Sequence, residues 1–375
     1  MPSQNAMTRS PASTRRDFIA GGAAVGLGLV GVASGLVSRV HAADFRTEKT
    51  SDYTVLRRAI EAWKARGGGR LALEPGRNYD LGAVAAGDHV FDLRGLAGAE
   101  LDGNGATLRC TTAGHGKTQM FLVRACRDLT FTNLRAEDRG TDLRREWRGM
   151  DFLHLDASGG AIDGVSLSGV TVDGAVSLLS CSGGPGSPRA ARIRLIEVEA
   201  RNCYYGLSFQ ENGDDVAGSL RAVNCRRAYF PYGVRSHDLA LDIHHDGVGP
   251  GGDACILVKR YRRDTQDLAI RARFSGELPW RHLLKLETQP PAGEVATIRD
   301  VDVRLEVDDA ASARAQSNLV AIGALRNGQV QKRTSDRWEG IRVSSCGTLA
   351  GRVERLSEPL GGGDIVVTAD RARCT

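Results

Sequence analysis

The sequence is poor in aromatic residues: Phe, Trp and Tyr together make up only 5% of its 375 residues. This scarcity excludes a sandwich filled by large rings. Glycine, at 46 residues, is abundant instead, and glycine adopts the backbone conformations that tight turns need. We therefore expect many sharp turns and small, stacked side chains, in a chain long enough for one large domain or two ordinary ones.

Metal-binding patterns are also missing. None of the eight cysteines belongs to a CxxC motif, and no Cys/His cluster has the spacing of a zinc site, so no structural metal site is predicted. The even number would permit disulfides in an exported protein, but cysteine is also a common small buried residue. We expect free, buried thiols.

A long apolar run is absent after residue 42, so no stable membrane insertion is expected of that part. Before it, Arg15 and Arg16 precede a Gly-, Ala- and Val-rich run over residues 20–37, and residues 40–42 resemble a processing site. We predict a twin-arginine-type signal peptide over 1–42, with a membrane anchor as the alternative. Residues 43–375 would then be a single periplasmic or secreted domain.

That domain carries almost no excess of basic over acidic residues. Residues 1–42 hold four arginines and one aspartate, which leaves 46 basic and 44 acidic residues beyond them. A net charge of +2 on residues 43–375 gives no reason to expect nucleic acid or an anionic membrane as a partner.

Helical periodicity is confined to residues 51–66. Five apolar residues recur there on one helical face, Ser51 or Asp52 can cap the N-terminus, and three glycines at 67–69 end the pattern. The five residues are Val55, Leu56, Ala59, Ile60 and Trp63.

The remaining pattern is short strands that turn corners. Residues 193–209 alternate apolar and charged side chains, slip by one residue between Leu195 and Val198, and alternate again. The same template recurs at 128–136 and 164–173, and Asn202-Cys203 is echoed by Asn224-Cys225. Repeated coils of short strands without intervening helices predict a parallel β-solenoid whose first end the helix caps.

Two stretches resemble a known family. Residues 51–81, with a helix, a Gly-rich turn, a strand and a Pro-Gly turn, resemble the start of the pectate-lyase-like right-handed parallel β-helix proteins. The DGNGATL stretch at 102–108 is similar to an early coil of that family. The resemblance spans about 45–350 and implies an all-β, right-handed parallel β-helix. It does not select one function, because the family holds lyases, polygalacturonase-type hydrolases, epimerases, phage depolymerases and non-catalytic members.

The resemblance implies a groove along one sheet, which we identify with the strands that follow the Asn-Cys corners. These are residues 121–124, 153–156, 178–181, 207–210, 230–233, 256–259 and 283–286. Alternation predicts an outward column, with the register around 229–233 open by one residue. The predicted column is Arg124, Asp156, Cys181, Gln210, Gly233 and Lys259.

An outward column that combines Arg, Asp, Gln and Lys side chains suits a sugar chain that carries carboxylates. Arg124 and Arg235 are candidate carboxylate clamps, and His154, Tyr232 and Lys259 are candidate bases. Gln210, Tyr261 and Trp147 are further candidate substrate-binding residues, Trp147 from a loop at 137–150. Ordinary solvated polar side chains are the alternative interpretation of the same column.

Asp214 and Asp215 form the other candidate pair. Adjacent carboxylates beside a groove can act as acid and base, or they can bind a cation, for which Ca²⁺ is the candidate. After Asn-Gly, adjacent aspartates also simply form a turn. Polygalacturonase-type hydrolases carry a similar Gly-Asp-Asp, yet their His-Gly and Arg-Ile-Lys partners do not follow here. In a second stretch that resembles these hydrolases, at 252–259, Ala254 stands where they carry the second Asp.

These patterns predict an exported protein that cleaves or modifies an acidic polysaccharide, preferably as a lyase. A glycoside hydrolase that uses two carboxylates is the alternative enzyme, and a non-catalytic glycan-binding β-helix protein is the third possibility. The oligomeric state stays open. The hydrolase would draw its two carboxylates from Asp156, Glu211, Asp214 and Asp215.

Overall fold

The structure is a computed structural model that belongs, in its described part, to the unit Val37–Thr375. The described residues are 39–47, 51–85, 87, 89–113, 116–141, 148–184, 186–247, 249, 251–308, 317–326, 328–346, 353–359 and 364–370.

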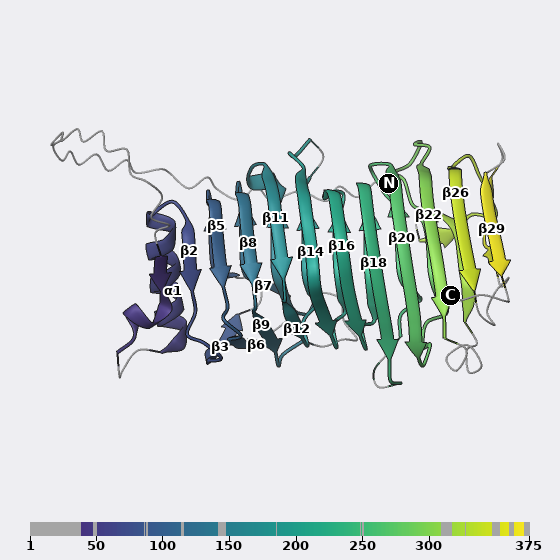
Figure 1. Cartoon of the computed structure of the whole chain (residues 1–375). Coiled ribbons are helices and arrows are strands. Elements are labelled where there is room, and N and C mark those ends of the chain that lie inside the picture. Colours follow the sequence, from purple (N-terminus) through teal and green to yellow (C-terminus); the bar gives the residue numbers. More distant parts are fainter. Residues whose placement is uncertain are drawn as a thin grey trace, which may run out of the picture. The chain divides into compact units, whose positions relative to one another are not determined.

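Helix α1 (Asp52–Ala65) covers one end of the strand stack (Figure 1). Ser51 caps it, because the Ser51 Oγ accepts a hydrogen bond from the Thr54 N–H at 3.3 Å. The five apolar residues predicted for one face are all buried and share a core with the strands. The cap therefore shields the inner side chains of the first coil from water. Two 3₁₀ turns, η1 (Ala42–Phe45) and η2 (Ala157–Gly159), are the other helical elements described.

Two long sheets run along the stack, and Figure 1 shows the strands of the larger one side by side. In the described part of the chain, the larger sheet has sixteen strands: β1 (Arg39–His41), β2 (Gly69–Ala72), β3 (Asn78–Ala85), β5 (Ala97–Asp102), β6 (Thr107–Ala113), β8 (Arg127–Thr132), β9 (Arg135–Asp138), β11 (Ile162–Ser168), β12 (Thr171–Asp173), β14 (Ala190–Arg201), β16 (Asp214–Val223), β18 (Arg235–His245), β20 (Thr265–Gly276), β22 (Thr297–Val307), β26 (Arg337–Cys346) and β29 (Ile365–Asp370).

The second sheet has eleven strands among the described residues, and a separate pair is formed by β25 (Arg333–Thr334) and β28 (Glu358–Pro359). The eleven are β4 (His89–Arg94), β7 (Lys117–Arg124), β10 (Gly149–Asp156), β13 (Ser177–Ser182), β15 (Tyr205–Gln210), β17 (Arg227–Tyr232), β19 (Ala254–Arg260), β21 (His282–Thr288), β23 (Asn318–Arg326), β24 (Gln329–Val330) and β27 (Val353–Arg355). Neighbouring coils pair in parallel, which confirms the predicted right-handed parallel β-helix.

The slip in the sequence pattern is a corner of the coil, as predicted. The pairing of β14 with β16 shifts register between Leu195 and Val198, and both residues remain buried because Glu197 between them turns the chain with a φ of 52°. Asn202 and Asn224 turn the next corner with φ of 47° and 53°, a left-handed region that asparagine tolerates better than most residues. Regular alternation on either side of these corners keeps the apolar side chains inside.

Cysteines contribute to the interior as small buried side chains. Six of them are free and buried: Cys110, Cys126, Cys181, Cys203, Cys225 and Cys255. Cys346 departs from the expectation of free thiols, because it is disulfide-bonded. The eighth, at position 374, lies outside the described residues.

The predicted signal peptide remains a prediction, and most of it lies outside the described residues. Its last residues form β1, which pairs with β2, and both Val40 and Ala42 are buried. Cleavage after residue 42 would therefore remove an edge strand of the larger sheet. Within the described residues, no helix is both long and apolar enough to cross a membrane.

Loss of one inward side chain should destabilise the stack. Leu167 is fully buried between Phe131 and Leu195 of the neighbouring coils, so Leu167→Ala should lower the free energy of unfolding by about 2–5 kcal/mol. Ser166→Ala, a half-buried neighbour on the opposite face of the same strand, should change it by less than about 0.5 kcal/mol. Urea unfolding measures both, and equal losses would show that inward packing does not dominate stability.

Candidate functional site

One residue from each of eight successive strands of the smaller sheet lies in a row on its outer face, which we call the central row. In-register parallel pairing produces this row, since equivalent residues of successive coils lie beside one another. Its members are Arg94, Arg124, Asp156, Ser182, Gln210, Tyr232, Lys259 and Glu287.

The structure shifts two members of the predicted outward column by one residue: Cys181 was wrong, and the register around 229–233, left open by one residue, is now defined. Cys181 points inward and is fully buried, and Ser182 takes its place in the central row. The adjacent Leu178 and Leu179 are both buried, so β13 lacks the alternation that would have set its register. Tyr232, not Gly233, is the row member from β17.

The aromatic residues of β17 explain why its register stayed open in the sequence. Phe230 lies on the outer face, where its ring stacks on Tyr205 at 5.4 Å between centroids and is almost fully covered. An apolar residue on the outer face hides the alternation from a sequence pattern. The Tyr232 ring packs in turn against Phe230 at 5.2 Å, and its hydroxyl donates to the Gln210 Oε1 at 3.4 Å.

A cleft of about 330 Å³ opens beside the central row, at the ends of β10, β13, β15 and β17. Four of the predicted site residues, Asp156, Gln210, Tyr232 and Tyr261, lie together in its lining. The remaining lining residues include Glu211, a candidate hydrolase carboxylate, and Arg262, part of a basic run at 259–263. These remaining residues are Ser158, Ser182, Gly183, Gly184, Glu211 and Arg262.

Asp156 is held at one edge of the cleft as an anion. Arg124 donates to its Oδ2 from Nε at 2.9 Å, and the backbone N–H of Ser158 donates to its Oδ1 at 3.1 Å. Burial alone would raise the pKa of Asp156, but the hydrogen bonds from Ser158 and Arg124 outweigh burial and lower it. The carboxylate can accept hydroxyl hydrogen bonds, and Arg124 is occupied by it.

Lys259 lies beside Tyr232 in the register but is already paired. Its Nζ is 3.0 Å from Glu287 Oε1, and Lys285 binds the other oxygen of the same carboxylate at 2.9 Å. Burial would raise the pKa of Glu287, but the two lysines outweigh it and lower the pKa. The Lys259 ammonium is thus neutralised within the protein.

Arg262 is the cation that the cleft leaves available. Its backbone N–H donates to Glu211 Oε1 at 2.7 Å, and its guanidinium lies 5.3 Å from the centre of the Tyr261 ring. Among the described residues its side chain has no ion-pair partner. A basic run at 259–263 is visible in the sequence, but only the pairing pattern shows that Lys259 and Arg260 bind carboxylates, whereas Arg262 in the cleft lining does not.

Asp214 and Asp215 lie outside the cleft lining and each binds an arginine. Arg189 binds the Asp214 carboxylate with two nitrogens, one of them Nε at 2.8 Å from Oδ2. Arg194 binds both oxygens of Asp215 at 2.9 and 3.0 Å. Within the described part of the chain, no group of three or more His, Cys, Asp or Glu side chains is arranged to hold a metal ion.

Arg189 also fixes the loop that carries Glu211. Its Nη1 donates to the Glu211 carbonyl at 3.1 Å. The buried Asn212 accepts from Ala190 N–H at 2.6 Å and donates to the Pro188 carbonyl at 2.9 Å. The structure therefore gives these polar residues a loop-fixing role, and this loop holds Glu211 against the cleft.

Three further candidates lie elsewhere. Arg235 lines a separate hollow with Arg189 and Arg263, and Trp147 lies outside the described residues. His154 is not in the cleft lining but contacts Ser182, which is, through its Nε2 at 3.0 Å from Ser182 Oγ.

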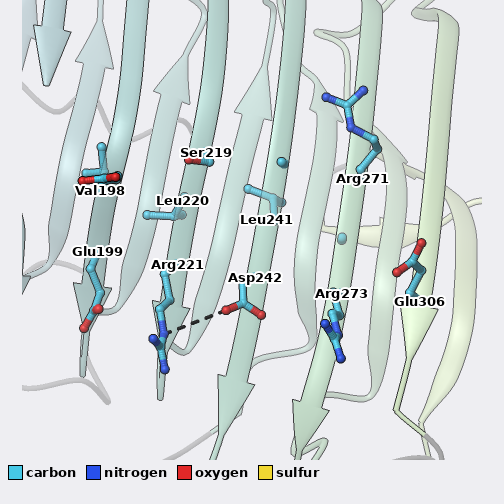
Figure 2. Close-up of a pocket in the computed structure, with 13 residues that line it drawn as sticks. Val198, Glu199, Ser219, Leu220, Arg221, Leu241, Asp242, Arg271, Arg273 and Glu306 are labelled. Atoms are coloured by element: carbon cyan, nitrogen blue, oxygen red, sulfur yellow. Dashed lines mark ion pairs between the residues drawn. The ribbon is translucent and has the colours of Figure 1, made fainter. Parts of the chain in front are cut away.

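A larger hollow of about 600 Å³ lies on the other sheet, over β14, β16, β18, β20 and β22. Figure 2 shows that its charged side chains come from neighbouring strands, with Arg221 joined to Asp242 at 3.9 Å. The register alternates their signs across the sheet, a pattern that stabilises strand pairing and places each charge beside one of opposite sign. The alternating series is Glu199, Arg221, Asp242, Arg273 and Glu306.

Solved structures with this fold include carbohydrate-active proteins. An endo-xylogalacturonan hydrolase from Aspergillus tubingensis matches with a TM-score of 0.60 and 14% identity, over 88% of this chain and 93% of that chain. A mutant tailspike of E. coli bacteriophage HK620 in complex with a pentasaccharide matches with a TM-score of 0.46 and 11% identity, over 88% of this chain and 65% of that chain. The catalytic domain of a GH87 α-1,3-glucanase in complex with nigerose matches with a TM-score of 0.39 and 10% identity, over 92% and 70%.

At these identities the first of the three similarities supports the fold alone, and the other two are too distant in structure to carry an argument. No family model matches the sequence, and no curated protein matches it either.

The two adjacent aspartates should differ in their effect on stability. Asp214→Asn should lower the free energy of unfolding by about 1.5–3 kcal/mol, because it breaks charged hydrogen bonds of a half-buried carboxylate. Asp215→Asn should cost about 0.5 kcal/mol or less, since its ion pair is exposed to solvent. Urea unfolding of both variants checks the order, and a larger loss at Asp215 would contradict it.

His237, beneath the Glu211 loop, should make stability depend on pH. The Tyr229 hydroxyl donates to its Nδ1, its Nε2 donates to the Gly213 carbonyl at 3.0 Å, and burial lowers the pKa of His237 to about 4. In the unfolded chain its pKa is about 6.5, so the unfolded state takes up the proton first as pH falls. This contribution is complete above about pH 6.5 and is lost as pH falls towards about 4.

The loss attributable to His237 between about pH 7 and pH 5 is about 2 kcal/mol. His237→Gln should remove that part of the pH dependence in urea unfolding, whereas His244→Gln, on the same strand, should retain it. An unchanged pH difference in His237→Gln would show that another group is responsible.

Proposed function

We propose that the cleft beside the central row binds an acidic polysaccharide and cleaves it by β-elimination. Arg262 carries this proposal, because it is a cleft cation whose charge no described residue neutralises. A uronate carboxylate is the sugar group that such a guanidinium would bind, through paired hydrogen bonds. The likeness in fold to an endo-xylogalacturonan hydrolase supports a polysaccharide substrate.

β-Elimination requires few groups, and the cleft offers them. Arg262 would neutralise the uronate carboxylate and thereby make the C5 proton easier to remove. Tyr232 Oη, positioned by Gln210 and by packing against Phe230, would take that proton as the deprotonated phenolate. The C4–oxygen bond then breaks, a C4–C5 double bond forms, and Tyr232 Oη returns the proton to the departing oxygen, which regenerates the phenolate. Asp156 and the tyrosine ring of Tyr261 would bind sugar hydroxyls and ring faces.

Hydrolysis is the second candidate, because two carboxylates, Asp156 and Glu211, line the same cleft. Glycoside hydrolases need such a pair, one member of which must carry a proton. The lowered pKa of Asp156 leaves Glu211 as the proton donor in that scheme. Elimination ranks first since it uses the unpaired Arg262, for which hydrolysis has no role.

A panel of uronate polymers tests the assignment through the ultraviolet absorbance of the unsaturated product. The wild type should produce that absorbance, and Tyr232→Phe should lower the rate by about 10²–10⁴-fold, as expected for loss of a proton acceptor. Arg262→Ala should also slow the reaction strongly. Arg273→Ala, which changes an exposed arginine on the other sheet, is the matched control and should retain the wild-type rate.

Other products would identify the other candidates. New reducing ends without ultraviolet absorbance would contradict elimination and support hydrolysis by Asp156 and Glu211. Binding of a polymer with no new ends would contradict both and favour a non-catalytic glycan-binding protein. The export assigned to residues 1–42 also remains a proposal.

A further inference from the structure

We propose that Ser182 is a second reactive centre in the cleft, a nucleophile activated by His154 that removes O-acyl groups from the glycan. Ser182 Oγ is 3.0 Å from His154 Nε2, within hydrogen-bond distance. Ser182 lines the cleft, whereas His154 does not. The nucleophile itself is independent of the proposed function, but the acylated glycan as substrate rests on it.

The imidazole of His154 is oriented from its other side. Its Nδ1 is 2.6 Å from Ser180 Oγ and 3.9 Å from Asp151 Oδ2. With the proton on Nδ1 donated to Ser180, Nε2 is left as the acceptor for the Ser182 hydroxyl. Burial lowers the pKa of His154, which favours the neutral imidazole that this role requires.

Asp151 provides a buried negative charge beside the imidazole. It is only 2% exposed, and its Oδ1 accepts a hydrogen bond from Ser177 Oγ at 2.5 Å. When His154 takes the serine proton, the imidazolium lies next to this carboxylate and is stabilised by it. Asp151, His154 and Ser182 thus have the roles of an acid–base–nucleophile set, on two neighbouring strands of a sheet.

The backbone after Ser182 can stabilise the negative charge that develops on the carbonyl oxygen during acyl transfer. Gly183 and Gly184 line the cleft, and neither N–H donates a hydrogen bond to any described residue. Only glycine fits at 183, since a Cβ there would lie 2.2 Å from the amide nitrogen of the buried Asn212. These two N–H groups are the donors that we assign to the oxyanion of the tetrahedral intermediate.

The chemistry balances with water as the only co-reactant. Ser182 Oγ attacks the carbonyl carbon of a sugar ester, and its proton passes to His154 Nε2. The tetrahedral intermediate collapses, the sugar oxygen leaves with that proton, and an acyl-serine remains. Water, deprotonated by His154, then attacks the acyl-serine and releases the carboxylic acid, which regenerates Ser182.

A fluorophosphonate probe tests the nucleophile without any glycan. The wild type should be labelled at Ser182, as mapped by peptide mass spectrometry, and Ser182→Ala should lose the label. His154→Asn should slow labelling by at least about 100-fold, as expected for loss of the base. Ser219→Ala, an exposed serine on the other sheet, is the control and should be labelled like the wild type. An unlabelled wild type, or a label that persists in Ser182→Ala, would overturn the proposal.

Acetate release from acetylated uronate polymers tests the substrate. Release by the wild type and loss of release in Ser182→Ala would support the glycan ester, and labelling of Ser182 without acetate release would overturn that part. Chain cleavage is followed separately on deacetylated polymer. Cleavage without labelling would reject the serine centre alone, whereas labelling without cleavage would reject the proposed elimination alone.

Discussion

Parallel pairing in register between successive coils is the constraint on which the rest of this structure depends. A single coil cannot bury its inward side chains, so each one needs the equivalent residue of the next coil against it. Ile193, for example, lies between Val165 and Val216, and all three are fully buried. Each corner must restore this register, and for that reason residues such as Glu197 and Asn202 adopt the left-handed conformation.

The same constraint places equivalent outward residues of successive strands in rows, in which neighbouring residues are about 4.8 Å apart. On the larger sheet, charges of opposite sign follow one another and neutralise each other, as Arg221 and Asp242 do. On the smaller sheet, Arg124 pairs with Asp156 and Lys259 with Glu287, one pair at each end of the cleft. Between these pairs lie uncharged hydroxyls and an amide, and Glu211 and Arg262 line the cleft from segments that follow β15 and β19. What distinguishes the cleft is not a surplus of charge but an arginine and a glutamate, Arg262 and Glu211, that form no ion pair with any described residue.

Sequence patterns predicted the fold well because burial repeats along the chain. Leu195 and Val198 identified a corner, and the five apolar residues of α1 identified its buried face. The candidate site was harder to predict. Two consecutive leucines hid the register of β13, and the pattern therefore indicated Cys181 in place of Ser182 as the outward residue. Ion pairs between coils, such as Arg189 with Asp214, leave no local signal, and the sequence therefore could not separate structural carboxylates from those in the cleft.

The spacing of the Asn-Cys corners has an evolutionary consequence. Cys203 and Cys225 occupy equivalent places in successive coils, so the chain between them is one complete modular unit with its own corner, inner layer and outer row. Copying or deleting such a unit would change the number of rungs on the outer face of the stack, while every surviving interface would keep the same kind of neighbour. The length of that face can thus change by duplication within the gene, and the row residues of a coil can be inherited intact by its copy.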